Sequence, residues 1–302
     1  LLVPESAHGT NPATAAFAGF SVEDIPATAE GRVDLAALKA RLGPDVAGVM
    51  ITNPNTCGLF ERDMKAISDA VHAAGGYVYC DGANFNAIVG RVRPGDLGVD
   101  AMHINLHKTF STPHGGGGPG SGPVVLSEAL APFAPLPFVA KYGDVFRLIE
   151  EESVGEDHPQ TFGRMTAFHG QMGMFTRALA YILSHGADGL KQVAEDAVLN
   201  ANYILRSLDD VLDAPFGPSG PCMHEALFSD KGLAEGFSTL DVAKGLIDEG
   251  FHPMTVYFPL VVHGAMLVEP TETESKAALD QFIGALRSIA LRAQQGDPAL
   301  KS

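Results

Sequence analysis

Short apolar runs alternate with segments of helical spacing through the first half of the chain. Residues 46–53 (VAGVMITN) form a continuous apolar run, which is typical of a strand that is buried on both faces of a parallel sheet. Residues 62–76 show helical spacing that ends at two glycines, as a helix C-cap does. Further apolar runs at 77–84, 101–106 and 123–127 predict neighbouring strands, so we expect an α/β fold with a mostly parallel sheet and helices on both faces.

The pattern changes after about residue 161, where longer segments of helical spacing replace the short alternating elements. We expect helices over residues 166–186, 189–212, 238–250 and 275–293, and strands over residues 223–229, 251–262 and 264–270. These elements predict a smaller α+β domain at the C-terminal end. The chain is therefore divided into a large domain over residues 1–199 and a small domain over residues 200–302.

The composition fits this domain organisation and argues against some classes of binding partner. The chain has 302 residues, of which 46% are hydrophobic, which is enough for a large core. The chain begins at Leu1 rather than at methionine, and its first residues already have the apolar pattern of a strand. We therefore expect a fragment whose large domain is incomplete at its N-terminus. A net charge of −16 argues against nucleic acid and anionic membranes as partners, because such a surface repels phosphate groups. No stretch approaches the roughly 20 apolar residues of a membrane helix.

The cysteines indicate no disulfide framework. Cys57, Cys80 and Cys222 are odd in number, lie far apart and form no CxxC motif. This usage favours three half-buried thiols in a reducing compartment over a redox role.

Polar side chains follow three of the predicted strands, namely Asn53, Asp81 and Lys108. Ligands of parallel α/β sheets bind beyond the carboxyl ends of the strands, so these side chains are expected to share a cavity. An aspartate before glycine is ordinarily a turn former, and a single lysine is ordinarily solvated. Together, however, they match pyridoxal phosphate chemistry, in which a lysine amine forms a Schiff base and a carboxylate keeps the pyridinium nitrogen protonated. Asn53 is then a candidate donor to the phenolic oxygen of the ring.

The histidines of HINLHKTFSTPHGGGGPGSGP (residues 103–123) also offer metal ligands. On one extended strand, however, His103 and His107 would share a face while Lys108 points away from them. No carboxylate or thiol lies close in the sequence to complete a tetrahedral set with them and His114. We therefore expect no metal site.

The glycines of the same segment do not form a nucleotide-binding motif. In a Walker motif the lysine follows the glycines, whereas Lys108 precedes them. A GxGxxG motif would need a third glycine after Gly118 and Gly120, but position 123 is proline. We expect this run to be backbone that approaches a phosphate group or a partner chain closely.

Several motifs together resemble the glycine-decarboxylating P-protein of the glycine cleavage system. They are SAHGTNPATAAFAGF, ITNPNTCGLFERD, YCDGANFNAIVGRVRPGDLGVD, HINLHKTFSTPHGGGGPGSGPV and VEPTETESK. The C-terminal half, with GFHPMTVYFPL, is similar to subunit 2 of the two-subunit form of that enzyme. The resemblance implies a pyridoxal-phosphate enzyme of fold type I, with the aspartate-aminotransferase-like architecture.

The resemblance also implies roles for individual residues. Lys108 is the Schiff-base lysine and Asp81 the partner of the pyridinium nitrogen, while Ala83 lies under one face of the cofactor ring and His8 stacks on the other. For His8, the residues alone favour a structural histidine at a strand end.

Four further residues complete the expected site. Thr10 and Asn11 line it from the loop of His8, and His107 contacts the phosphate. The family's main phosphate-binding loop lies upstream of Leu1. A small-domain arginine that many aminotransferases use for the substrate carboxylate is absent, since the chain has Glu269 in MLVEPTET. Arg164 is the candidate for a looser substrate contact.

The implied reaction is glycine decarboxylation, with transfer of the aminomethyl group to the lipoyl arm of H-protein and release of CO₂. The implied partners are glycine, lipoylated H-protein and P-protein subunit 1, in an α2β2 heterotetramer of the cytoplasmic bacterial or archaeal type. Two alternatives stay open: another fold-type I enzyme, such as an aminotransferase or a sulfur-abstracting lyase, and a catalytically silent subunit. The presence of both Lys108 and Asp81 counts against the silent subunit.

Overall fold

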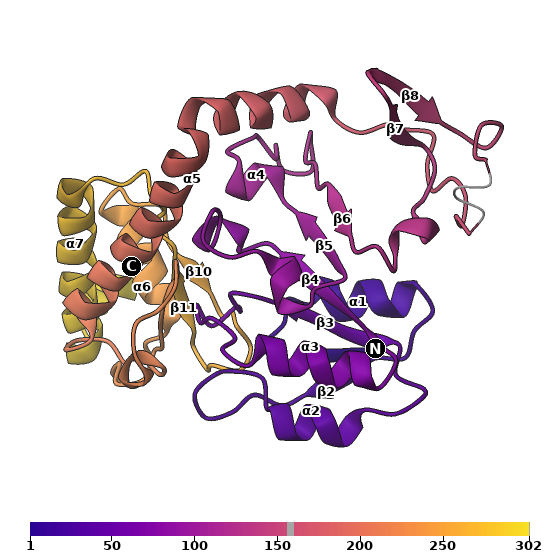
Figure 1. Ribbon diagram of the computed structural model, residues 1–302. Helices are drawn as coiled ribbons and strands as arrows, with labels where there is room; N and C mark the ends of the chain where they lie inside the picture. Colours follow the sequence, from indigo (N-terminus) through magenta and orange to yellow (C-terminus); the bar gives the residue numbers. More distant parts are fainter. Residues whose placement is uncertain (156–159, 302) are drawn as a thin grey trace.

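The computed structural model describes residues 1–155 and 160–301, and a six-stranded sheet forms its centre (Figure 1). The strand order is β2-β1-β3-β4-β5-β6. The strands are β1 (Leu2–Pro4), β2 (Glu23–Ile25), β3 (Gly48–Thr52), β4 (Tyr77–Gly82), β5 (Ala101–Ile104) and β6 (Val124–Leu126). All neighbours pair in parallel except β5 and β6, which are antiparallel, so the predicted mostly parallel sheet is confirmed.

Helices cover both faces of this sheet, as the apolar pattern predicts. The helices are α1 (Thr10–Phe17), α2 (Leu35–Arg41) and α3 (Met64–Ala73). Val49 and Ile51 of β3 join a core with residues of α2 and α3, whereas Met50 between them packs with Ala15 of α1. Alternation of side chains along β3 therefore places an apolar core on each side of the strand.

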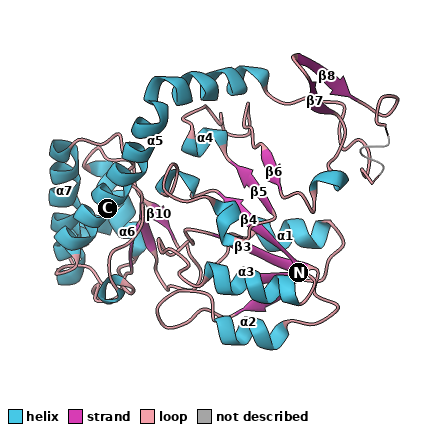
Figure 2. Ribbon diagram, in the orientation of Figure 1, coloured by secondary structure: helices cyan, strands magenta, loops and turns pink. Residues whose placement is uncertain are grey.

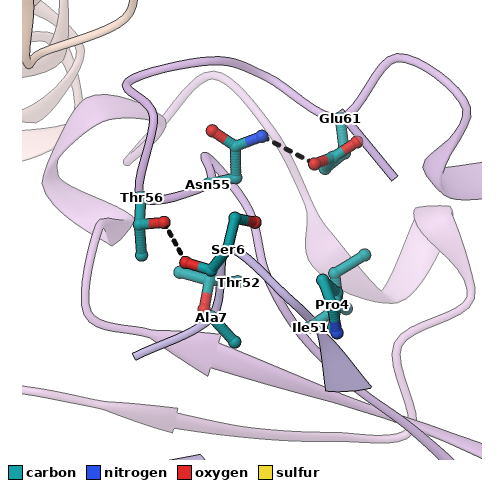
Figure 3. Close-up of a pocket in the computed structure, with 8 residues that line it drawn as sticks. All are labelled: Pro4, Ser6, Ala7, Ile51, Thr52, Asn55, Thr56 and Glu61. Carbon is teal, nitrogen blue, oxygen red and sulfur yellow. Dashed lines mark hydrogen bonds between the residues drawn. The ribbon is translucent and has the colours of Figure 1, made fainter. Parts of the chain in front are cut away.

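Beyond β3 the chain makes a tight turn that one asparagine holds in place (Figure 3). Asn55 Oδ1 accepts hydrogen bonds from the backbone N–H groups of Cys57 and Leu59, and Asn55 Nδ2 donates to Glu61 Oε1 at 2.7 Å. The hydroxyl of Thr56 donates to the carbonyl of Ser6 and so ties this turn to the loop after β1. The two loops are thereby fixed at the same edge of the sheet.

The segment around the lysine differs from the sequence prediction. The expected strand over residues 101–106 ends at Ile104, and residues 106–109 form the one-turn helix α4 (Leu106–Thr109). His103 lies on the strand while His107 lies on the helix. The prediction that both histidines share one face of a strand is therefore wrong. The argument against a metal site that relied on this shared face no longer holds.

The two helices expected over residues 166–212 form one long element, α5 (Met172–Leu208), which bends at Gly186. Gly186 has φ 64° and ψ −174°, a conformation open to glycine, so the chain changes direction without a separate loop. The predicted domain boundary at residue 200 falls inside this helix. It stays a prediction.

The C-terminal part has its own antiparallel sheet and core (Figure 2). The strand order is β10 (Thr255–Val256), β11 (Met266–Val268) and β9 (Ala226–Phe228), with helices α6 (Thr239–Asp248) and α7 (Lys276–Gln295). The last third of α5 packs into the same core through Ala201, Ile204 and Leu208. The expected strand over residues 251–262 is reduced to two residues, because Pro253, Pro259 and the left-handed Tyr257 interrupt it.

A projecting hairpin was not expected from the sequence. Its strands β7 (Phe138–Tyr142) and β8 (Val145–Ile149) stand away from the central sheet (Figure 1). The described part of the chain also contains short 3₁₀ helices: η1 (Phe85–Ala87), η2 (Pro94–Leu97), η3 (Ala131–Phe133), η4 (Gly217–Ser219) and, after α7, η5 (Pro298–Lys301). Among residues 1–155 and 160–301, no helix has the length and apolar character needed to span a bilayer.

Candidate active site

A cavity of about 1000 Å³ lies at the carboxyl ends of the central strands, between the sheet and the C-terminal part. Its walls include seven of the residues that the sequence singled out: His8, Thr10, Asn11, Asp81, Ala83, His107 and Lys108. They come from the loop after β1, the end of β4 and the helix α4, which the parallel pairing of the strands brings to one edge. The cavity is large enough for a small-molecule cofactor and a substrate.

Lys108 lies in the short helix α4 and is exposed to the cavity. The one-turn helix places its amine beyond the end of β5. Its positive charge lowers the pKa of two carboxyl groups of the cavity, Glu225 and Glu269, against the larger effect of desolvation, which raises both. The lysine therefore faces the acidic side of the cavity.

Asp81 is held by a network that the parallel register creates. The register pairs Asp81 of β4 with His103 of β5, and His103 Nε2 lies 3.3 Å from Asp81 Oδ1. The same Oδ1 accepts a hydrogen bond from the N–H of Ala83 at 2.9 Å. These contacts fix the carboxylate, of which little is exposed, at the wall of the cavity.

A tyrosine sets the orientation of His103. The Tyr79 hydroxyl lies 2.6 Å from His103 Nδ1, and the two rings stack with centroids 6.0 Å apart. Burial raises the pKa of Tyr79 to about 12, so the hydroxyl keeps its proton and can donate it to Nδ1. In that arrangement the ring N–H of His103 is on Nε2, which faces Asp81 and Asn105.

His8 is oriented by its neighbours on both sides. Its Nδ1 accepts a hydrogen bond from the N–H of Thr10 at 3.1 Å. The edge of its ring meets Phe258 of the C-terminal part, with centroids 5.6 Å apart. The histidine therefore stands in the cavity in a defined orientation.

Several polar atoms of the cavity wall are buried without a hydrogen-bond partner. They include Asn11 Nδ2, Thr52 Oγ1 and His107 Nδ1. The pKa of His107 is lowered, first by burial and then by His114 and Lys108, which favours the neutral ring. Unsatisfied groups of this kind mark a place for a polar ligand, and they fit pyridoxal phosphate, which offers a phosphate group and ring oxygens.

The structure does not bring Asn53 or Arg164 to the cavity wall. Asn53 is buried below it, where its Oδ1 accepts from the N–H of Glu61, although its Nδ2 has no partner. The Arg164 guanidinium is bound by Glu150 and Glu151 at 2.8–2.9 Å beside the hairpin. This pairing holds the pKa of Glu151 near 2 and occupies the donors that a substrate carboxylate would need.

Other residues of the site were missed or misread from the sequence. His103 was considered only as a metal ligand, although an aspartate and a histidine at matching positions of adjacent predicted strands could have indicated the pair. Glu225 and Glu269 also line the cavity. His224 lies beside these two glutamates and is fully buried. The glycines directly after His114 form an exposed turn, in which the N–H of Gly117 donates to His114 Nδ1 at 3.3 Å, and Gly120 lies close to the rings of both His107 and His114.

Two family descriptions match the chain. Residues 5–218 match the aminotransferase class-V family, and residues 193–297 match the glycine dehydrogenase C-terminal domain. The chain is 70% identical over 299 residues to a probable glycine dehydrogenase (decarboxylating) subunit 2 of Caulobacter vibrioides, covering 98% of the chain and 56% of that relative. A protein of the same name from Oceanobacillus iheyensis is 52% identical over 296 residues, covering 98% of the chain and 59% of that relative. The chain thus spans less than three fifths of these relatives.

Solved structures support the same fold. A glycine decarboxylase (P-protein) of the glycine cleavage system, in inhibitor-bound form, matches with a TM-score of 0.77 at 21% identity, over 95% of this chain and 65% of the other. A sphingosine-1-phosphate lyase of Burkholderia pseudomallei matches with a TM-score of 0.71 at 15% identity, over 99% and 64%. The expected fold type I architecture is confirmed, and the families involved depend on pyridoxal phosphate.

Proposed function

The chain belongs to the aminotransferase class-V family, and from this membership and its likeness to glycine dehydrogenase subunit 2 we propose that the full-length protein decarboxylates glycine. The aminomethyl group would pass to the lipoyl arm of H-protein, with release of CO₂. One observation carries the proposal: Lys108 and Asp81 line the same cavity, together with His8 and unpartnered polar groups. Pyridoxal phosphate, when bound, would withdraw electrons from the α-carbon of an amino acid so that its carboxylate can leave.

The residues that line the cavity would have different functions in binding the cofactor. Lys108 supplies the amine that bonds to the cofactor, and Asp81 supplies a fixed negative charge for a ring nitrogen. His103 and the N–H of Ala83 prevent that carboxylate from turning away. His8, on the loop after β1, would flank the ring of a bound cofactor. Neutral His107 and the amide of Asn11 are available as donors to the phosphate.

Among residues 1–155 and 160–301, no arginine lines this cavity to bind a substrate carboxylate. A tight guanidinium clamp would stabilise the bound amino acid as well as the transition state, and decarboxylation needs the carboxylate to leave. The wall instead presents Glu225 and Glu269. We propose that this favours glycine over amino acids with an acidic side chain, which these carboxyl groups would repel.

A partner subunit would cover the apolar surface around the hairpin. Phe146, Phe162, Met165 and Met172 are each more than 60% exposed, and exposed apolar clusters of this kind typically mark interfaces. The name of the relatives, subunit 2, implies a subunit 1 in those proteins. We propose that the full-length chain pairs with such a subunit and that lipoylated H-protein docks at the mouth of the completed cavity.

The test uses the full-length chain co-expressed with subunit 1. Carboxyl-labelled glycine and lipoylated H-protein should give labelled CO₂, and Lys108→Ala should abolish the release. Borohydride should attach the cofactor irreversibly to the wild-type chain but not to the variant. The proposal fails if Lys108→Ala retains full CO₂ release.

The two alternatives give different results in the same assay. An aminotransferase would move the amino group to a 2-oxo acid without releasing labelled CO₂. A catalytically silent subunit would show neither CO₂ release nor borohydride trapping on Lys108.

A further inference from the structure

Two carboxyl groups meet at the C-terminal side of the cavity. Glu225 directly precedes β9 and Glu269 directly follows β11, and the antiparallel register pairs their neighbours Ala226 and Val268. Glu225 is only 8% exposed, and its Oε2 has no hydrogen-bond partner. Glu269 opens to the cavity and accepts a hydrogen bond from Asn86 Nδ2 at 3.1 Å. The pairing of the strands therefore forces two acidic side chains into one place.

A buried histidine adjoins the pair without neutralising it. His224 is fully buried, and neither of its ring nitrogens has a partner. Its Nε2 lies 3.7 Å from Glu225 Oε2 and 3.8 Å from Glu269 Oε1, beyond hydrogen-bonding distance. Burial, and then the charge of Lys108, lowers the pKa of His224 to about 3, so the ring is uncharged at neutral pH.

The other titratable groups that face the pair do not supply a compensating charge, except for one lysine. These groups are Lys108, Cys57 and Cys222. Burial raises the pKa of both thiols to about 12, so they are neutral. Among residues 1–155 and 160–301, Lys108 is the cation whose charge acts on both carboxyl groups.

The buried Glu225 and the partly exposed Glu269 beside it cannot both ionise easily, because Glu225 loses its hydration and the two carboxylates repel each other. Burial is the largest cause that raises the pKa of each, and repulsion by Glu269 raises that of Glu225 further. Both effects favour a state in which the pair keeps one proton beside one negative charge, opposite the positive charge of Lys108.

We propose that Glu225 and Glu269 hold one shared proton beside Lys108 and act as positioning residues that compensate changes in the charge of its amine. When the amine loses its charge, an N–H bond on Nζ breaks and an O–H bond forms on the carboxylate of the pair, so the cavity gains no net negative charge. When the amine is charged again, a carboxyl O–H bond breaks and an N–H bond forms on Nζ. This proposal is inferred from the positions of Glu225, Glu269 and Lys108, and it does not depend on which reaction takes place in the cavity.

Infrared difference spectroscopy during a pH titration tests this pair on the cofactor-free, full-length chain with its partner subunit. The wild type should retain a protonated carboxyl band well above pH 5, where exposed carboxyl groups are ionised. Glu225→Gln should remove this band, since the remaining Glu269 opens to the cavity. Glu269→Gln should keep the band but titrate at lower pH, since Glu225 loses its repelling neighbour.

The coupling to the lysine is tested by Lys108→Ala. This variant should raise the midpoint of the band by about one pH unit, a roughly tenfold rise in proton affinity, because the stabilising cation is gone. Glu235→Gln, an exposed glutamate of the C-terminal part, is the matched control and should leave the band unchanged. Glu61, another buried acid whose pKa is raised, should contribute a band that none of these variants alters.

Three results would overturn the proposal. One is survival, in Glu225→Gln with wild-type circular dichroism, of the band component assigned to the pair, as distinct from the constant component of Glu61. The second is a midpoint that Lys108→Ala leaves unchanged. The third is binding of Zn²⁺ by the wild type that is lost in Glu225→Gln, since His224 and the two glutamates would then be metal ligands. Glu269→Gln keeps the test decisive if Glu225→Gln does not fold, because Glu269 is partly exposed.

Discussion

Gly82→Ala should separate the two strands that carry the site. Gly82 ends β4, directly after Asp81, and a Cβ atom added there would lie 2.0 Å from the backbone oxygen of His103 on β5. It would also lie 2.8 Å from Met102 Cε. Since an ordinary contact between carbon and oxygen is about 3.3 Å, the strands would have to part locally by about 1.3 Å.

The cost follows from these contacts. Overpacking of this kind costs about 1–3 kcal/mol, and each strand hydrogen bond lost adds about 1 kcal/mol. We therefore expect Gly82→Ala to lower the free energy of unfolding by about 2–4 kcal/mol. Because Asp81 and His103 face each other across this gap, the variant should also bind pyridoxal phosphate more weakly.

Urea unfolding of the full-length chain, followed by circular dichroism, measures the first effect. Gly95→Ala is the matched control, because a Cβ at Gly95 meets no atom within 4 Å and its backbone is not left-handed. The control should stay within about 0.5 kcal/mol of the wild type. If Gly82→Ala is also as stable as the wild type, the close approach of β4 and β5 is not as described.

The remaining predictions concern charge and thiol reactivity. Asp81→Asn should reduce CO₂ release from glycine by at least about 100-fold, because a preorganised charge is lost; an activity within tenfold of wild type would refute its role. Glu225 has a raised pKa in the folded state, so the wild type should lose stability as pH rises from about 4.5 toward that pKa, and Glu225→Gln should flatten this part of a thermal-melting profile. The three cysteines are buried with pKa values of about 12, so native protein should react with iodoacetamide far more slowly than protein in urea, as mass spectrometry would show. Arg164→Ala should leave the KM for glycine within about twofold, since Glu150 and Glu151 already bind that guanidinium; a larger rise would restore Arg164 as a substrate contact.

The apolar pattern was sufficient to predict much of the fold. Continuous runs such as residues 46–53 can be buried only between two helical layers, and so they predicted β3 and its neighbours in the central sheet. The pattern failed where a short apolar run did not reveal its conformation. Residues 105–109 leave the strand and form a turn of helix, and the interrupted segment 251–262 contributes only two strand residues.

The site was predicted by the same reasoning only in part. A lysine and an aspartate at strand ends are visible in the sequence, because the carboxyl ends of parallel strands meet at one edge. The order of the strands is not visible, and only that order places His103 beside Asp81. Arg164 was predicted to contact the substrate but lies outside the cavity, since the sequence could not reveal that Glu150 and Glu151 bind its guanidinium.

The sequence by itself therefore determined the class of fold and identified Lys108 and Asp81 as candidate site residues, because both depend on local pattern and on residue type. Only the tertiary structure decided what surrounds them. Glu225 and Glu269 are 44 residues apart in the chain (269 − 225), and they meet because β9 and β11 pair in one register. Their charges depend on burial and on the distance to Lys108, and both are properties of the packed chain.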